Sequence, residues 1–277
     1  MSEVRCVLLH GFAGAPESWD PVVELLPPGW RVTRPAVAGH DRSAEWPAGV
    51  ARFDDEVDRL ARVVAEDGGD DRAILGGYSL GGRLALGLLA RHPGRWRGAL
   101  VIGAHPGLPE AALPEAGLPV AGRPEGGLAE GAVEAAARAE RVAADERWAR
   151  SIETDLDGFV DQWARLPLFA TQRAAAPAVL AAQQRIRRRH HRQTLARAMR
   201  VLSLGAMPDR LPALAGNRVP LVAMAGALDE KFSGLVVRMA ERIPHARAVL
   251  VPGAGHNVPL EAPAAVAAAL AELAGDD

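Results

Sequence analysis

Ser79 lies between glycines in the stretch "GYSLG", residues 77–81. This G-x-S-x-G spacing is typical of a nucleophile elbow, a sharp strand-to-helix turn that exposes a serine hydroxyl. The turn forces an uncommon backbone conformation on the serine, so its neighbours must be small. An apolar run precedes the motif and a helix-like pattern follows it. The sequence therefore predicts a reactive serine, although a glycine-rich turn with an incidental serine has the same pattern.

A serine hydroxyl needs a histidine to act as its base and an acid to orient that histidine. In an elbow-type fold these residues follow in the order serine, acid, histidine. Asp229 in "GALDEKF" and His256 in "AGHNVPLE" each come just after a predicted strand. Glu230 competes with Asp229, which could instead only cap a helix, and His256 could be a loop residue without a role. We predict a triad of Ser79, Asp229 and His256.

Two backbone N–H groups are expected to form an oxyanion hole beside the serine. One is that of Leu80, directly after Ser79, and the other is that of Phe12 in "LHGFAG". His10 precedes this loop, and we interpret it as a structural hydrogen-bonding residue. His40, in "AVAGHDRS", is interpreted as structural as well.

Predicted strands and helices alternate at both ends of the chain. This alternation favours a mostly parallel, twisted sheet covered by helices on both faces. At a parallel sheet's carboxyl edge, residues from distant strands can meet. The predicted strands lie within 5–14, 30–40, 72–79, 98–105, 218–229 and 246–256, and the predicted helices within 52–67, 80–93, 233–244 and 263–274.

The middle of the chain breaks this alternation. Residues 106–127 are rich in proline and glycine and are predicted to be a loop. Helical patterns follow within 130–153, 156–166 and 177–204, with no convincing strand. We predict an α/β-hydrolase core formed by residues 1–105 and 206–277, with residues 106–205 inserted as a helical cap.

Composition limits the other possibilities. The chain has 277 residues with a formal net charge of −2, so a nucleic-acid-binding or membrane-binding surface is not expected. Cys6 is the only cysteine, which excludes an internal disulfide. Neither a signal peptide nor a transmembrane stretch is evident, so a cytoplasmic monomer or small homo-oligomer is expected. Lys231 is the only lysine.

The pattern resembles the α/β-hydrolase superfamily over nearly the whole chain. Within it, the chain is similar to the 2-succinyl-6-hydroxy-2,4-cyclohexadiene-1-carboxylate synthase family of menaquinone biosynthesis. "GYSLGGR", "HPGL" and the "DEKF" stretch are its more specific motifs. The other stretches that carry the resemblance are "LLHGFAGAPESW", "DERWARSIETDLDGFVDQWARLPLFA", "LSLGAMPD" and "AGHNVPLEAP".

The resemblance implies a lyase that uses no cofactor and no metal. Its substrate would be the small tricarboxylate 2-succinyl-5-enolpyruvyl-6-hydroxy-3-cyclohexene-1-carboxylate. Ser79, made basic by His256 and Asp229, would remove a proton α to a carbonyl, and pyruvate would be eliminated. The developing enolate oxygen would lie between the N–H groups of Phe12 and Leu80.

A substrate with several carboxylates calls for arginines, whose guanidinium can form two parallel hydrogen bonds. Arg83 lies one helical turn after the serine, although it could also be a solvated surface residue. The resemblance implies that cap arginines join it, with Arg141 at the first position. Arg187 is expected at the second.

Arg185 and Arg188 compete with Arg187 for that second position. We expect most of the basic run 185–192 to be exposed, including His190 and His191. Trp163 would form a wall of the pocket or simply pack, and Tyr78 would lie beside the serine.

A serine carboxylesterase or thioesterase with the same triad is the main alternative. It would have an apolar acyl pocket in place of converging arginines. A non-catalytic binding protein of the same fold is disfavoured by the intact set of serine, aspartate and histidine.

Overall fold

A six-stranded parallel sheet forms the centre of the molecule. The computed structural model describes residues 3–67, 72–107 and 130–275. The strands are arranged in the order β2-β1-β3-β4-β5-β6, and all five neighbouring pairs are parallel. The strands are β1 (Val4–Leu9), β2 (Trp30–Thr33), β3 (Ala73–Tyr78), β4 (Trp96–Ile102), β5 (Leu221–Gly226) and β6 (Ala246–Val251). The predicted α/β sheet is therefore confirmed.

The strand order reverses direction between β1 and β3. The chain passes from β1 to β2 on one side and then to β3 on the other, after which the strands follow in order. Ligands of parallel sheets bind beyond the strand carboxyl ends at such a switch point. The "HGFAG" loop follows β1 and Ser79 follows β3, so these two segments flank this point.

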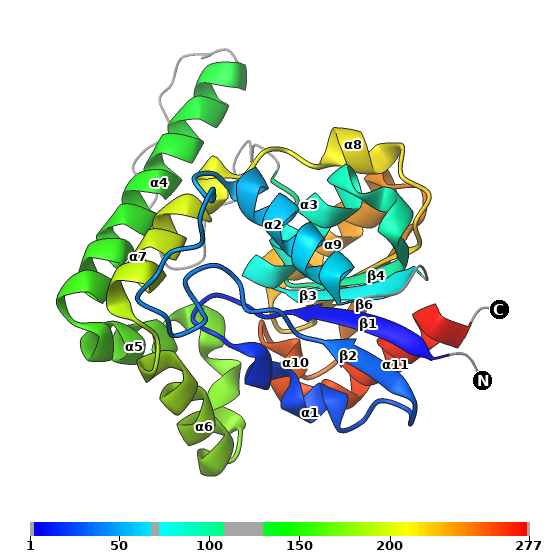
Figure 1. Ribbon diagram of the computed structural model, residues 1–277, viewed down its shortest axis with the longest axis horizontal. Helices are drawn as coiled ribbons and strands as arrows, with labels where there is room; N and C mark the ends of the chain where they lie inside the picture. Colours follow the sequence, from blue (N-terminus) through cyan, green and yellow to red (C-terminus); the bar gives the residue numbers. More distant parts are fainter. Residues whose placement is uncertain (1–2, 68–71, 108–129, 276–277) are drawn as a thin grey trace.

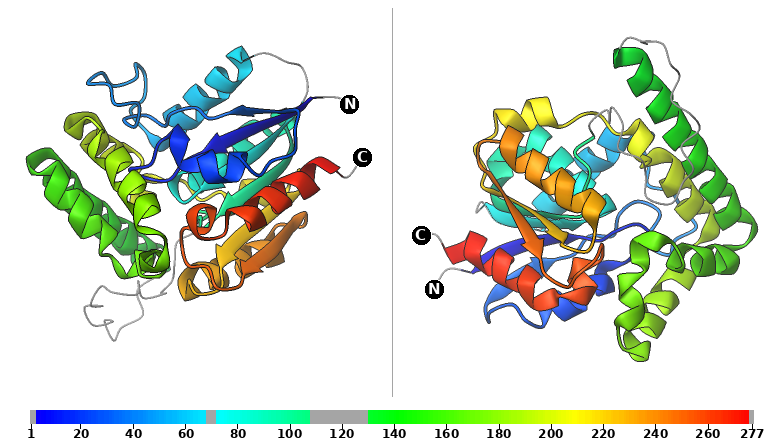
Figure 2. Two further views of the ribbon diagram at one scale, coloured as in Figure 1. Left: turned by 90° about the horizontal axis from the view of Figure 1, so that it is seen from below. Right: turned by 180° about the vertical axis from the view of Figure 1, so that it is seen from behind.

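Helices cover both faces of the sheet (Figure 1). One face carries α2, α3, α8 and α9, and the other carries α1, α10 and α11, as the reverse view also shows (Figure 2). Their bounds are α1 (Asp20–Val23), α2 (Phe53–Glu66), α3 (Leu80–Arg91), α8 (Leu211–Ala215), α9 (Glu230–Arg242), α10 (Val258–Glu261) and α11 (Pro263–Gly275).

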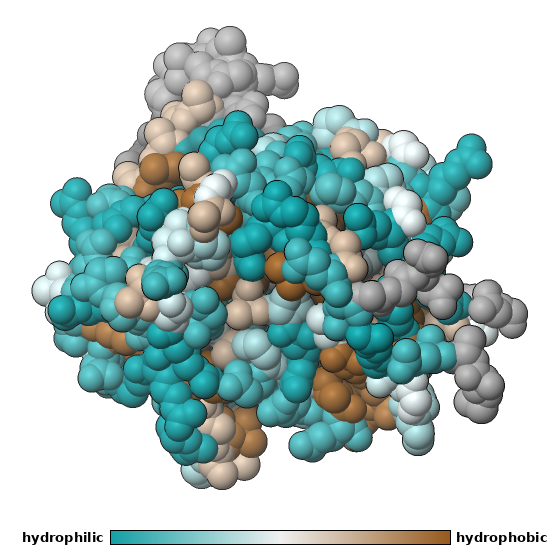
Figure 3. Space-filling view, in the orientation of Figure 1, coloured by the Kyte–Doolittle hydropathy of each residue, from teal (hydrophilic) through white to brown (hydrophobic). Residues whose placement is uncertain are grey.

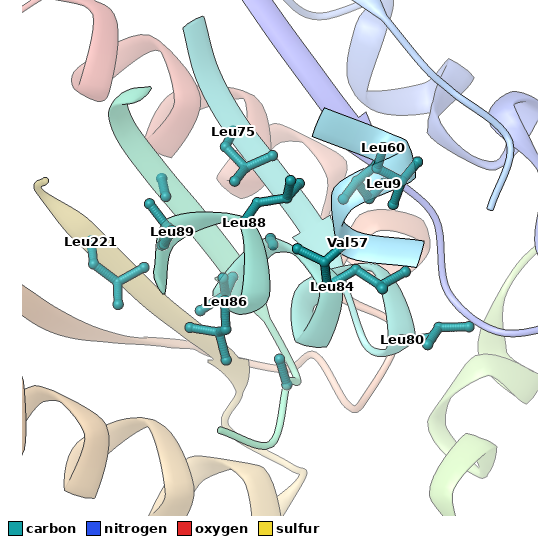
Figure 4. Packing of buried hydrophobic residues seen from close by; sticks show 14 of the residues in the cluster. Leu9, Val57, Leu60, Leu75, Leu80, Leu84, Leu86, Leu88, Leu89 and Leu221 are labelled. Atoms are coloured by element: carbon teal, nitrogen blue, oxygen red, sulfur yellow. The ribbon is translucent and has the colours of Figure 1, made fainter. Parts of the chain in front are cut away.

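The apolar side of α2 closes one core. Val57 and Leu60 of α2 and Leu84 of α3 are fully buried, and they pack with Leu75 of β3 and Leu9 of β1 (Figure 4). A helix with apolar residues at this spacing is stabilised by burying that face. The predicted helix within 52–67 is confirmed.

A second group of helices lies beyond the carboxyl ends of the strands (Figures 1 and 2). In the described residues between β4 and β5 every regular element is helical. The predicted loop 106–127 lies almost entirely outside the described residues. The longer helices of this group are α4 (Glu130–Thr154), α5 (Leu156–Ala164), α6 (Pro177–Arg188) and α7 (Arg192–Val201).

The helical pattern predicted within 177–204 is interrupted in the structure. α6 ends at Arg188 and α7 begins at Arg192, with the backbone of His191 extended at φ −78° and ψ 120°. The turn changes which side chains face inward, because the second helix starts in a new direction.

Most of the surface seen in Figure 3 is hydrophilic, with apolar residues in separate small patches. No helix within the described part of the chain is both long and apolar enough to cross a membrane.

The contact between α3 and β1 gives the first testable prediction. A Cβ on Gly81 would lie 2.0 Å from the carbonyl oxygen of Leu9, which is backbone and cannot move aside. We expect Gly81→Ala to lower the free energy of unfolding by about 1–3 kcal/mol or more, as overpacking does. Chemical denaturation measures the change.

Gly94→Ala is the matched control, because nothing lies within 4 Å of a Cβ at that position. It should unfold like the unmodified chain. Equal stability of the two variants would show that the close approach of α3 to β1 is not a constraint.

Candidate active site

Ser79 occupies the strained corner that the sequence predicts. Its backbone has φ 51° and ψ −110°, a left-handed region that residues with a side chain rarely adopt. The Ser79 N–H donates to the carbonyl of Ile102 at 2.8 Å, which ties the corner to β4. A Cβ on Gly77 would lie 2.4 Å from the carbonyl oxygen of Gly81, so the motif glycines are sterically required.

A hydrogen-bonded chain links the three predicted triad residues. The Asp229 carboxylate lies 2.8 Å from Nδ1 of His256, and Nε2 of that ring lies 3.4 Å from the Ser79 hydroxyl. The second distance is long, but such bonds shorten when substrate binds. Asp229 and His256 are 9% and 2% exposed, so the acid–imidazole contact is protected from water.

Asp229 has both roles that the sequence left open. One carboxylate oxygen contacts His256, and the other accepts the N–H of Phe232 at 3.3 Å as the cap of α9. The helix cap therefore holds the acid in place for the imidazole. Glu230, the competing acid, begins α9 and is exposed.

A cavity of about 500 Å³ opens above these residues, between the sheet edge and the helices α4, α5 and α7. Ser79, His256, Phe12 and Leu80 all line it. Leu80 is the first residue of α3, so its N–H has no partner within the helix. Both predicted oxyanion donors thus belong to residues at the same cavity as the serine.

Aromatic rings form much of the cavity wall. Trp163 of α5 lies 5.6 Å from the ring of Phe12 and 5.4 Å from that of Trp148. All three residues line the cavity, as does Phe169. Trp163 therefore packs against its aromatic neighbours and also lines the cavity in which a ligand would bind.

Arg83 lines the cavity and is not a solvated surface residue. Its guanidinium donates to the carbonyl of Leu202 at 2.8 Å. Burial, together with the nearby charge of Arg141, lowers the pKa of Arg83 to about 9, while the carboxylate of Asp145 acts in the opposite direction. The group is still a cation at neutral pH, held where few water molecules can solvate it.

Arg141 of α4 also lines the cavity and is oriented by Asp145, one helical turn further on. Two contacts join their side chains, at 2.9 and 3.0 Å. Asp145 is buried and accepts a third hydrogen bond from the hydroxyl of Ser203 at 2.7 Å. Both predicted arginines therefore line the cavity, and the charge of Asp145 acts on each of them.

Arg187 is the arginine of its run that faces inward. It is 5% exposed, with its guanidinium 5.5 Å from the ring centroid of Phe169. Burial lowers its pKa to about 10. Arg185 is exposed, and Arg188 forms surface ion pairs with two aspartates of α5.

Tyr78 and Arg187, which were expected to bind substrate, do not belong to the residues that line this cavity. The Tyr78 ring is 5.5 Å from that of His256, and burial raises the pKa of its hydroxyl. Each supports the site from outside its wall.

The expected exposure of His190 is wrong. Its side chain is 4% exposed and lies 5.3 Å from the ring of His40, whereas His191 is half-buried. The reason is the break between α6 and α7, which turns His190 inward. His10 and His40 are both buried and bonded to backbone groups, as their structural interpretation requires.

Three ionisable cavity residues were missed by sequence reasoning: Asp145, His105 and Lys231. Burial, followed by the charges of Lys231 and Arg83, lowers the pKa of His105 to about 3, so the imidazole is neutral at pH 7. The motifs "HPGL" and "DEKF" contained two of these residues, but spacing alone did not point to the cavity. Asp145 has a local signal, its position four residues after Arg141 on one helix.

Comparisons with known proteins show which family the chain belongs to. Residues 6–269 match the Alpha/beta hydrolase family. The 2-succinyl-6-hydroxy-2,4-cyclohexadiene-1-carboxylate synthase of Enterobacter sp. (strain 638) is 30% identical over 270 residues, covering 96% of this chain and 90% of that protein. The enzyme of the same name from Salmonella paratyphi C is 32% identical over 268 residues, covering 96% and 92%.

Solved structures share the fold. MenH from S. aureus superposes with a TM-score of 0.84 at 23% identity, covering 99% of this chain and 94% of that one. A thermophilic esterase from Thermogutta terrifontis gives a TM-score of 0.76 at 23% identity, covering 98% and 89%. The chain therefore belongs to the α/β-hydrolase family and, within it, to the family of the 2-succinyl-6-hydroxy-2,4-cyclohexadiene-1-carboxylate synthases.

Proposed function

We propose that this protein is a cytoplasmic lyase of menaquinone biosynthesis. It eliminates pyruvate from 2-succinyl-5-enolpyruvyl-6-hydroxy-3-cyclohexene-1-carboxylate and forms 2-succinyl-6-hydroxy-2,4-cyclohexadiene-1-carboxylate. The observation that carries the proposal is the linked set of Asp229, His256 and Ser79 in a cavity that Arg83 and Arg141 also line.

Ser79 acts as the base in this reaction. Its hydroxyl proton passes to Nε2 of His256 as its oxygen takes the ring proton α to the substrate carbonyl. Asp229 stabilises the imidazolium that forms and keeps the ring in the orientation that the transfer requires. The short Asp229–His256 contact and the burial of both groups support this role.

The electron pair of the broken C–H bond moves toward the carbonyl oxygen. The N–H groups of Phe12 and Leu80 stabilise the negative charge that develops there. The pair then forms a double bond between ring carbons C2 and C3, the existing C3–C4 double bond shifts to C4–C5, and the C–O bond from C5 to the enolpyruvyl group breaks. Pyruvate leaves as its enolate and takes up a proton, and loss of the extra proton from His256 returns the triad to its starting state.

Arg83 and Arg141 hold substrate carboxylates. Desolvated cations in a cavity interact strongly with an arriving anion, because little water screens them. Asp145 keeps the Arg141 guanidinium in a fixed orientation, which favours a bidentate contact. The Arg187 guanidinium packs on the ring of Phe169 and helps to hold that ring in the cavity wall.

An ester hydrolase with the same triad would need an apolar acyl pocket. The two cations that line the cavity, Arg83 and Arg141, favour a polyanionic substrate instead. The decisive assay compares pyruvate release from the enolpyruvyl substrate with the cleavage of a short p-nitrophenyl ester. Efficient ester turnover without pyruvate release would contradict the lyase proposal.

Substitutions in the triad test the proton transfer. We expect Ser79→Ala, His256→Ala and Asp229→Asn each to lower kcat by roughly 10³- to 10⁴-fold, the usual effect of removing a triad member. Substrate affinity should change little, because these groups act on the transition state. Pyruvate release measures kcat, and isothermal titration with the product measures binding.

Arg83→Ala tests the anion site. Losing a charged hydrogen bond worth about 1.5–3 kcal/mol should lower kcat/KM by roughly 10- to 100-fold, with both kcat and KM affected. Arg83→Lys should recover part of the loss, because an ammonium keeps the charge but not the two-pronged geometry.

The exposed Arg185 supplies the control for this test. Arg185→Ala removes the same charge from the chain and should leave the kinetics unchanged. Unaltered kinetics in Arg83→Ala would remove Arg83 from the binding site.

A further inference from the structure

The loop after β1 has to aim one peptide N–H into the cavity. In a trans peptide the carbonyl of Gly11 and the N–H of Phe12 point in opposite directions. The Gly11 carbonyl accepts the N–H of Gly14 at 3.0 Å and lies 2.9 Å from Nδ1 of His10. These contacts fix the orientation of the peptide between Gly11 and Phe12.

The next peptide, between Phe12 and Ala13, has a different partner. The N–H of Ala13 donates to Nε2 of His40 at 3.1 Å. Ala13 has φ 54°, a left-handed conformation that costs energy for any residue with a Cβ. A buried acceptor at this N–H helps to hold the strained turn in place.

The proton positions on His40 follow from its neighbours. Because Nε2 accepts from Ala13, the ring proton is on Nδ1, which donates to the carbonyl of Ala38 at 3.0 Å. Burial keeps the ring neutral by lowering its pKa well below the usual value. His40 therefore connects the loop after β1, which carries the Phe12 N–H and is called the oxyanion loop here, with the loop that follows β2.

The ring of His40 is also enclosed by two other side chains. The Phe12 ring meets it edge-on, with centroids 5.3 Å apart. On another side it contacts His190, also at 5.3 Å, from the turn between α6 and α7. The turn between α6 and α7 thus contacts the loop after β1 through His40, while α5 contacts Phe12 directly.

We propose that His40 is a positioning residue for the oxyanion hole: it holds the Phe12–Ala13 peptide so that the Phe12 N–H points into the cavity, and His190 supports its ring. The inference rests on the proposed function only for its kinetic readout. His40 does not touch the substrate, so its effect is on kcat and not on binding.

Two amide variants separate the two hydrogen bonds of the ring. In His40→Gln the side-chain oxygen reaches about as far as Nε2 and can still accept from Ala13. In His40→Asn the amide corresponds to Nδ1, so it can still donate to Ala38 but does not reach Ala13. The exposed His245, far from the loop in sequence, provides the control His245→Asn.

We expect His40→Asn to lower kcat by roughly 10- to 100-fold, part of the loss caused by deleting an oxyanion donor, with KM changed less than about threefold. His40→Gln should recover most of this activity, and His245→Asn should behave like the unmodified chain. Equal kcat values for the Asn and Gln variants, or parallel loss of kcat and melting temperature, would overturn the proposal.

Residue-resolved hydrogen exchange gives a readout independent of turnover. The Ala13 amide of the unmodified protein should exchange slowly, and faster in His40→Asn than in His40→Gln. Rapid exchange in the unmodified protein would overturn the proposal even if a variant fails to fold. Absence of pyruvate release by the unmodified chain would contradict the proposed function, while the exchange experiment would still test the role of His40.

Discussion

Parallel strands that end at one edge are the constraint on which the site depends. Ser79 follows β3, Asp229 follows β5 and His256 follows β6, yet their side chains form one hydrogen-bonded chain. None of the three is near another in sequence. The sheet therefore determines the distances between them, while the buried core under α2 and α3 keeps the strand ends from moving apart.

Helices next to the carboxyl edge of the sheet bring charged side chains to the site. Arg83 comes from the helix that begins at the serine, and Arg141 comes from α4 on the opposite wall. Asp145 forms an ion pair with Arg141, and its negative charge offsets part of the repulsion between the two arginines. An arriving carboxylate would compensate the rest, so the cavity is already arranged for an anion before any substrate binds.

The serine, histidine and oxyanion hole of an ester hydrolase can also carry out proton abstraction with the same backbone arrangement. A serine beside an imidazole can attack a carbonyl carbon or accept a proton, and an oxyanion hole stabilises charge in either case. The two kinds of enzyme differ in the substrate that the residues lining the cavity can bind. In the proposed reaction, the arginines and the aromatic rings of Phe12, Trp148 and Trp163 would favour a polyanionic ring over a simple acyl chain.

The sequence by itself determined the alternating elements, the elbow at Ser79 and the order of the acid and the histidine, because each depends on short-range patterns. Helix register favoured Arg187 within its basic run, and Arg187 is the buried arginine of that run, but it does not belong to the residues that line the cavity. Only the tertiary structure decided that Ser203 donates to Asp145, that Lys231 and His105 reach the cavity, and that His190 is buried against His40. These contacts depend on where helices end and how they pack on the sheet edge, which no local spacing specifies.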